Sequence, residues 1–286
     1  MAGALPGDLL VLANRIFTGH FETSRSGTPT LGIGLCGSSQ TVIDVNDLGR
    51  SGLRLEGANY WTVAGFTITG GLFGIFAAES SHNRITGMTI HGIGQEAIIF
   101  RRSSSQNVIE GNTIYDTGLT VPEFGEGVYL GTSYGRWENG DPDRSDGNII
   151  IGNTFGPNVR AEHIDVKEGT TGGLIANNAF DGAGMIPTFA WGPHSWVTVQ
   201  GNGYTIRENS GTRAVRHGFK VFQELPGWGN GNVFSKNTAD VGAEGFGFLI
   251  DLDTSGNIVL CDNVVLNAGS GLANIQCLSD LSSPSR

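Results

Sequence analysis

The sequence predicts an all-β protein, a single right-handed parallel β-helix with an N-terminal cap. Two short strand-like segments alternate along most of its 286 residues, and one of them carries a recurring asparagine. No helical 3.6-residue pattern of apolar residues lies between these segments. Repeats with periods of about 20–50 residues are typical of stacked repeat proteins. We expect residues 1–50 to form the cap and first strands, and 51–286 the β-helix coils and a C-terminal tail, all in one domain.

The first recurring segment is a short alternating strand followed by an asparagine and a second apolar position. It reads NRITGMTIHG from residue 83, NVIEGNTIYD from 107, NIIIGNTFGP from 148, GLIANNAFDG from 173, NVFSKNTADV from 232 and NIVLCDNVVL from 257. Asparagine tolerates the left-handed conformation that turns require. Its return at one turn position predicts a ladder of side chains hydrogen-bonded along the stack.

The second recurring segment is a strand with large apolar residues at its third and fifth positions. It reads EAIIFR from residue 96, EGVYLG from 126, EHIDVK from 162, SWVTVQ from 195, HGFKVF from 217 and EGFGFL from 244. The shortest interval, from 195 to 217, is 22 residues, about one coil of three short strands. Parallel strands joined in this way are expected to wind with the right hand.

Alternation within the second segment sorts its side chains into an inner and an outer row. The third and fifth positions, up to Phe246 and Phe248 in the last copy, should point into the coil. Coils about 4.8 Å apart then bring the outer side chains into one patch roughly 20 Å tall. We expect this patch to hold Arg101, Tyr129, His163, Asp165, Lys167, Trp196 and Lys220. Long connections such as TSYGRWENGDPDRSDG would wall the patch into a groove.

Composition and charge exclude several classes of function. The net charge of −10 argues against nucleic-acid binding, which needs a basic surface. It also disfavours an acidic polymer unless basic side chains gather locally, as they do in the predicted patch. No apolar run approaches the roughly 18 residues needed to span a bilayer, and no secretion leader is visible at the start. We expect a monomer.

The three cysteines are Cys36, Cys261 and Cys277. Cys261 and Cys277 share the final coil and tail, so we expect them to lie within bridging distance, which leaves Cys36 unpaired. Three buried thiols remain the alternative, because free cysteine is often buried.

Two stretches resemble the pectate-lyase-like β-helix superfamily, most closely the alginate lyase and chondroitinase B type of polysaccharide lyases. ALPGDLLVLANRIFTGHFETSRSGTP, with SGLRLEGANYWTVAGFTITGG after it, is similar to that family's cap and first coil. AEHIDVKEGTTGGLIANNAF is similar to its catalytic strand. Extracellular actinobacterial β-helix proteins of unassigned function are similar as well. The resemblance implies a secreted protein whose partner is an acidic polysaccharide.

The resemblance also implies roles for individual residues. Glu162 and Asp165, with Glu126, would bind a calcium ion that neutralises a uronate carboxylate, and Lys167 would abstract the C5 proton. The family's arginine about one coil later is missing, because AWGPHSWVTVQG stands there. Its work would pass to Arg101 or Lys220, and Tyr129 would protonate the leaving oxygen. We expect His163, His194, Gln200 and two tryptophans, Trp191 and Trp196, to contact the sugar.

Each of these assignments has an alternative. Asp165 raises the pKa of Lys167, so Lys167 serves as a base only if a cation compensates the carboxylates; otherwise the two form a plain salt bridge. Glu96, Glu126 and Glu162 share a register position and need a cation or a proton unless they splay into solvent. DPDRSDGN, residues 141–148, has the alternating oxygens of a calcium loop but is also typical of a solvated turn.

Three functions fit the predicted groove. The first is a lyase that cleaves an acidic polysaccharide by β-elimination. The second is a glycoside hydrolase with a carboxylate pair drawn from Glu126, Glu162 and Asp165, because carboxyl groups about 5 Å apart suit a retaining mechanism. The third is a β-helix that binds carbohydrate without catalysis.

Overall fold

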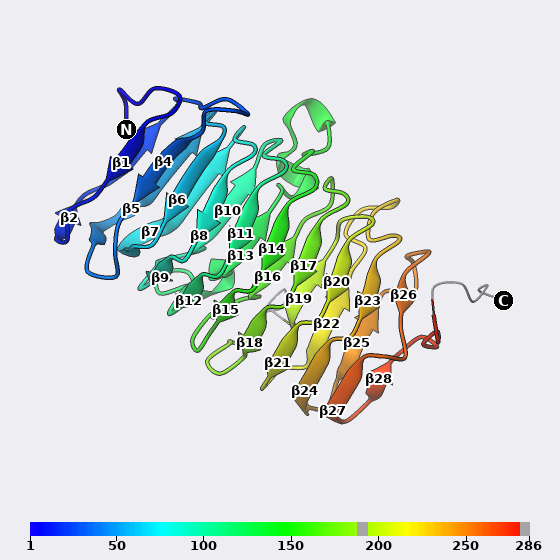
Figure 1. Ribbon diagram of the computed structural model, residues 1–286. Coiled ribbons are helices and arrows are strands. Elements are labelled where there is room, and N and C mark those ends of the chain that lie inside the picture. Colours follow the sequence, from blue (N-terminus) through cyan, green and yellow to red (C-terminus); the bar gives the residue numbers. More distant parts are fainter. Residues whose placement is uncertain (188–193, 281–286) are drawn as a thin grey trace.

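The protein is a parallel β-helix in a computed structural model that describes residues 1–187 and 194–280. Short strands stack coil upon coil, with β1 at one end of the stack and β28 at the other (Figure 1). Paired strands run parallel, and the described residues contain no α-helix between them. The predicted fold is confirmed. The described residues also contain no helix with the length and hydropathy needed to cross a bilayer.

One side of the stack is a ten-stranded parallel sheet. Its strands, in spatial order, are β1 (Leu9–Val11), β4 (Ile33–Cys36), β6 (Trp61–Ala64), β8 (Arg84–Thr86), β11 (Val108–Glu110), β14 (Ile149–Ile151), β17 (Leu174–Ala176), β20 (Thr205–Arg207), β23 (Val233–Ser235) and β26 (Ile258–Val259).

The other two sides form one eighteen-stranded sheet, because β5 (Val42–Glu56) and β7 (Thr67–Ala78) run through both. The side that follows the asparagine turn holds β2 (Ile16–Thr18), β9 (Thr89–His91), β12 (Thr113–Tyr115), β15 (Thr154–Phe155), β18 (Ala179–Asp181), β21 (Ser210–Thr212), β24 (Thr238–Ala243) and β27 (Val264–Ala268). The third side holds β3 (Phe21–Thr23), β10 (Ile98–Arg101), β13 (Val128–Leu130), β16 (Ile164–Val166), β19 (Ser195–Val199), β22 (His217–Val221), β25 (Phe246–Ile250) and β28 (Gly271–Ala273).

Apolar side chains fill the inside of every coil. Ile98, Val128, Ile164, Val197 and Phe219 stand in register in successive coils and are fully buried, as the alternation predicts. The last copy of this strand is shifted by two residues from the predicted alignment.

In that last copy, Phe248 rather than Phe246 pairs with Phe219. Phe246 is only half-buried, and its ring stacks on His217. The expectation that Phe246 points into the coil is therefore wrong, because the strand alternation there begins two residues later.

The asparagine ladder predicted from the repeats is present. In Asn153, the backbone N–H and the side-chain amide both donate to Oδ1 of Asn178 in the next coil, at 2.9 and 3.0 Å. The same amide donates to the carbonyl oxygen of Ile109 in the preceding coil, at 2.9 Å. The ladder consists of Asn112, Asn153, Asn178, Asn209, Asn237 and Asn263, all of them buried. Each turn thus pairs its polar groups with its neighbours.

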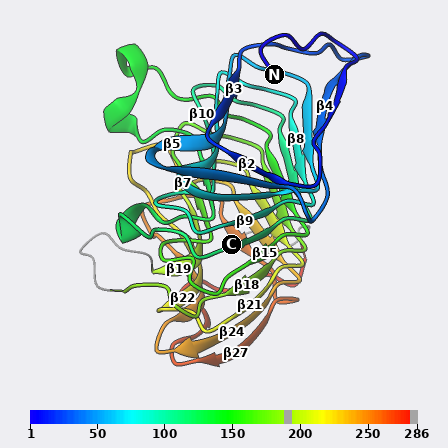
Figure 2. The same cartoon turned by 90° about the vertical axis from the view of Figure 1, so that its left-hand side faces the viewer.

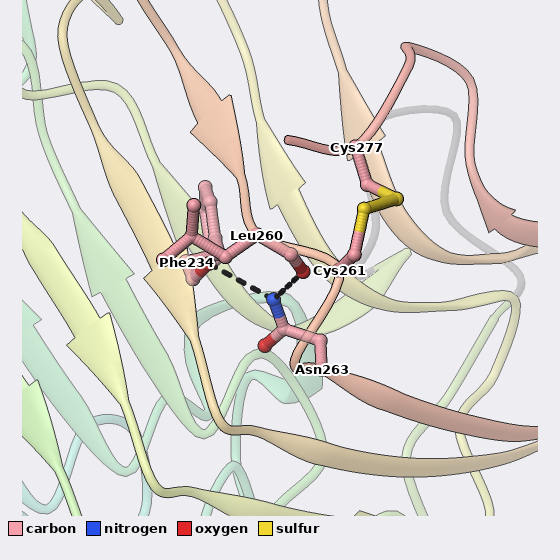
Figure 3. Close-up of a disulfide and its surroundings, with 5 residues drawn as sticks. All are labelled: Phe234, Leu260, Cys261, Asn263 and Cys277. Atoms are coloured by element: carbon pink, nitrogen blue, oxygen red, sulfur yellow. Dashed lines mark hydrogen bonds between the residues drawn. A yellow bond between two sulfur atoms is a disulfide. The ribbon is translucent and has the colours of Figure 1, made fainter. Parts of the chain in front are cut away.

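A disulfide between Cys261 and Cys277 fastens the C-terminal tail to the last coil (Figure 3). A parallel bridge between Leu260 and Leu278 lies beside it. Asn263, the last member of the ladder, donates to the carbonyl oxygens of Phe234 and Leu260 (Figure 3). The predicted pairing is confirmed, and Cys36 is a free, half-buried thiol.

Asn178→Leu should lower the free energy of unfolding by about 3 kcal/mol, because it removes the acceptor of the buried Asn153 backbone N–H, one bond of the Asn153 side-chain amide, and the bond that Asn178 donates to the Ile150 carbonyl. The matched control is Asn177→Gly at the exposed neighbouring position, where φ is 54° and glycine is at ease. Denaturant unfolding of both variants measures the difference. Equal stabilities would show that the ladder does not hold the coils.

Cys277→Ser should lower stability by about 2–4 kcal/mol, because the tail is then free to leave the last coil. Hydrogen exchange should accelerate at Cys261 and Leu278, whose amides bond across this joint, and stay unchanged in the central coils. Faster exchange throughout the stack would contradict a local role.

Candidate functional site

A groove of about 820 Å³ lies on the third side of the stack, over β10, β13, β16, β19 and β22. These strands belong to successive coils. Two connections wall it, one with the 3-10 turn η1 (Pro122–Phe124) and the other with η2 (Tyr134–Arg136), which is followed by η3 (Glu138–Gly140). In Figure 2 the green loops around residues 120–140 project from the same side as β10, β19 and β22.

Most of the predicted site residues line this groove. The structure brings together Arg101, Glu126, Tyr129, Glu162, Asp165, Lys167, His194, Gln200 and Lys220. Trp191 lies outside the described residues. One concave surface shared by five coils therefore holds three of the charged residues that the sequence concentrates between 162 and 168, namely Glu162, Asp165 and Lys167.

His163 and Trp196 are exceptions, and the expectation that they face the sugar is wrong. Both side chains are fully buried. The His163 ring stacks on Phe180 with centroids 5.6 Å apart, and its Nε2 lies 3.1 Å from the carbonyl oxygen of Asp181. Burial lowers the pKa of His163 to about 3, so the ring is neutral. Trp196 packs against Phe180 and Phe219.

These two side chains turn inward because the strand begins at a corner of the coil, where the second and third positions both face the core. Other coils place glycine or alanine at this second position, and a Cβ at Gly127 would meet the Phe155 ring at 2.6 Å. Trp196 fits because glycine stands at position 211, where earlier coils carry a phenylalanine such as Phe180. Gly211 stands two residues after the ladder asparagine Asn209, where Phe180 stands after Asn178, and this glycine is the sequence feature that indicates a large buried neighbour.

Lys167, Asp165 and Tyr129 form the centre of the groove. Nζ of Lys167 lies 2.8 Å from Oδ2 of Asp165 and 5.5 Å from the centroid of the Tyr129 ring. The side chains of Lys167 and Asp165 are only 17% and 6% exposed. Burial acts to lower the pKa of Lys167, but Asp165 and Tyr129 outweigh it and raise that pKa above its ordinary value. Burial raises the pKa of Tyr129.

Beside this centre, Glu96, Glu126 and Glu162 form the predicted ladder across three coils. Glu126 is buried and the other two are half-buried, so they do not splay into solvent. Burial raises the pKa of Glu96 and of Glu162 to about 7, and burial together with the neighbouring carboxylates raises that of Glu126 well above its usual range. The ladder therefore carries protons near neutral pH.

The same carboxylates offer donors of the kind that calcium prefers. Oε2 of Glu126 and Oδ1 of Asp165 are buried without a hydrogen-bond partner. Within residues 1–187 and 194–280, however, no three His, Cys, Asp or Glu side chains gather closely enough to hold a metal ion. The donors fit the ion, but the present arrangement does not form its cage.

The segment from 141 to 148 is an anchor for the groove wall. The buried Asp143 accepts hydrogen bonds from the backbone of Arg102 and Ser103, from the Thr132 hydroxyl, and from both donors of Ser145, at 2.6 to 3.1 Å. The chain's own donors thus satisfy this carboxylate and fix the connection to the neighbouring coil.

The anchored connection walls the groove, as its length predicts, and it brings Thr132, Ser133 and Arg136 to the lining, three residues that the sequence does not single out. A loop has no side-chain periodicity from which its direction could be read. Its only signal was the 36-residue interval between the strand copies at 126 and 162.

Comparison with known proteins shows which family the chain belongs to. Residues 26–140 match the family described as right handed beta helix region. The crystal structure of an alginate lyase from Paenibacillus sp. str. FPU-7 superposes with a TM-score of 0.87 at 33% sequence identity, over 96% of this chain and 94% of that one. The chain belongs to the right-handed β-helix family that contains this alginate lyase.

More distant solved structures share the fold. Pectate lyase Pel9A is 17% identical, with a TM-score of 0.57 over 96% of this chain and 71% of its own. A mannuronic acid specific polysaccharide family 6 lyase from human gut microbiota is 13% identical, with a TM-score of 0.61 over 97% and 73%. At these identities the likeness shows the β-helix fold alone. No curated protein sequence matches the chain.

Trp196→Ala should lower the free energy of unfolding by about 3–5 kcal/mol, because it empties a packed site between Phe180 and Phe219. His194→Ala, at a half-buried residue that lines the groove, should leave stability within about 0.5 kcal/mol. Denaturant unfolding compares the two. A small loss for Trp196→Ala would mean that the indole lies at the surface after all.

Proposed function

We propose that the protein is a polysaccharide lyase that cleaves an acidic, uronate-containing polysaccharide by β-elimination in this groove. The observation that carries the proposal is the contact of Lys167 with Asp165 and Tyr129 on the groove floor. The likeness to the Paenibacillus alginate lyase supports a polysaccharide lyase. We also propose that it acts outside the cell as a monomer.

The reaction needs two proton transfers. A base removes the C5 proton, the C4–O bond breaks as a C4–C5 double bond forms, and an acid protonates the departing oxygen. Lys167 and Tyr129 are neighbours with the reach for both transfers, and we assign Lys167 as the base and Tyr129 as the acid. Lys167 must first lose its own proton, so this assignment requires that the charge of Asp165 be compensated when substrate binds.

The uronate carboxylate must also be neutralised, because proton loss beside it adds negative charge. The chain itself supplies carboxyl groups that carry protons, since burial raises the pKa of Glu126 and Glu162. A protonated carboxyl group donates a hydrogen bond to the uronate without adding charge. Calcium stays a prediction: Glu126, Glu162 and Asp165 are the residues that would hold it, and it would neutralise the same carboxylate.

Lys167→Ala should reduce cleavage of a uronate polymer by more than about 100-fold while the fold survives, because it removes one proton-transfer group. The measurement is the absorbance of the unsaturated uronate product, across a panel of uronate polymers with and without a chelator. Lys236→Ala, at an exposed lysine on another side of the stack, is the matched control.

Two further variants separate the roles. Tyr129→Phe removes the hydroxyl and should be equally inactive. Lys167→Arg keeps the positive charge but cannot give up a proton at neutral pH, so it should be inactive if Lys167 is the base. Full activity in Lys167→Arg would overturn that role. New reducing ends without the absorbance would indicate the hydrolase, and binding without either signal would indicate a binding protein.

A further inference from the structure

Two cations at opposite ends of the groove, Arg101 and Lys220, each lie over an aromatic ring. Neither takes part in the proton transfers assigned to Lys167 and Tyr129. At one end, Cζ of Arg101 lies 4.4 Å from the centroid of the Phe76 ring. Nε of Arg101 is buried without a hydrogen-bond partner. In the described part of the chain no carboxylate lies within ion-pair distance of this guanidinium, although Arg54 on the same ring is paired with Glu56.

At the other end, Nζ of Lys220 lies 4.3 Å from the centroid of the Phe222 ring. Lys220 is half-buried and lines the groove, and it too lacks an ion-pair partner among the described residues. Each end therefore presents a cation that lies over an aromatic ring and makes no ion pair among the described residues, although carboxylates such as Glu96 near Arg101 and Glu162 near Lys220 lie further away.

An unpaired, partly buried cation is unfavourable, because burial removes its hydrating water and no protein group replaces the lost interactions. A cation–π contact offsets only about 0.5–2 kcal/mol of this desolvation free energy. The protein has 27 acidic residues against 17 basic ones, so carboxylates to pair with are plentiful. Both cations are nevertheless left open to the groove, which points to an anionic ligand that completes them.

The spacing defines the ligand. β10, which ends at Arg101, lies two coils before β16, and β22, which carries Lys220, lies two coils after it. With coils about 4.8 Å apart, each cation stands roughly 10 Å from the central Lys167 along the stack, on opposite sides. A single sugar at the centre reaches neither cation, whereas an extended polymer reaches both.

We propose that Arg101 on Phe76 and Lys220 on Phe222 each bind a carboxylate of the polymer, on opposite sides of the bond that is cleaved. The inference rests on the proposed function and deepens it. The substrate is then a run of uronate residues that spans β10 to β22, rather than isolated uronates between neutral sugars. Cleavage falls inside the chain, because both flanks must be occupied.

Binding tests the proposal without relying on catalysis. Oligouronates of increasing length are titrated calorimetrically into the Lys167→Ala protein and into the same protein with Arg101→Gln or Lys220→Gln added. Loss of a charge-assisted contact should weaken binding of the long oligomers about tenfold or more. A disaccharide, too short to reach either end from the centre, should bind equally weakly to all three.

Matched controls are Arg50→Gln and Lys236→Gln, which remove exposed cations that lie outside the groove and have no ion pair among the described residues. They should leave binding unchanged. A neutral glucan and a sulfated polysaccharide of similar length separate carboxylate recognition from sugar stacking and from general anion binding. Equal binding of the sulfated polymer would overturn a carboxylate site.

The outcomes also separate this proposal from the lyase assignment. If the enzyme cleaves polyuronate but Arg101→Gln and Lys220→Gln keep the same KM and the same product lengths, the flanking sites are wrong and the lyase stands. If no uronate polymer is cleaved, yet both substitutions abolish binding of long oligouronates, the sites stand and the lyase is wrong. Release of only terminal sugars by the wild type would contradict cleavage inside the chain.

Discussion

The asparagine ladder is the interaction on which the rest of this structure depends. A β-helix turns three times per coil, and each turn leaves backbone donors and acceptors that point along the stack rather than into a strand pair. Asn153 and Asn178 show the solution, in which one side-chain oxygen accepts two bonds from the coil before it. Buried polar groups left unpaired are unfavourable by about 1–3 kcal/mol each, so these turns can lie inside the stack only because they repeat in register.

The register of the turns fixes the register of the strands. Because the strands stay aligned, the side chains that form the groove come together. Tyr129, Asp165 and Thr198 stand opposite one another because their coils cannot slip. A slip of one residue would send each side chain to the opposite face. The site is therefore assembled from residues far apart in sequence and held at the coil spacing, with no movable element needed to bring its floor together.

The same rigid stacking brings several carboxylates close together at the centre of the groove. Glu96, Glu126 and Glu162 are held on adjacent coils, where burial raises the pKa of each and neighbouring carboxylates add to the rise, so the ladder carries protons near neutral pH. Asp165 is relieved by Lys167 instead. Further out, Arg101 and Lys220 make no ion pair within residues 1–187 and 194–280. The acidic middle and cationic ends suit a polymer whose own charges repeat along its length.

Much of the fold was determined by the sequence itself. Alternation of apolar residues, the asparagine at each turn and the cysteines near the end are local patterns, and each acts through its nearest coil. They were enough to predict the β-helix, the disulfide and the face that carries Lys167. They failed where a strand meets a corner: alternation assigns His163 and Trp196 to the outside, although two successive positions there face the core.

Only the tertiary structure decided which of the predicted side chains turn away from the groove and which further residues join it. Trp196 turns inward because Gly211 leaves space for its ring. This packing between coils cannot be predicted from either segment alone. Asp143 brought a connection without periodicity over the groove and placed Arg136 there. Burial, which depends on all neighbours at once, decided which carboxylates keep protons and which pair with lysine. Local pattern thus specified the scaffold, and packing between coils specified the chemistry available on it.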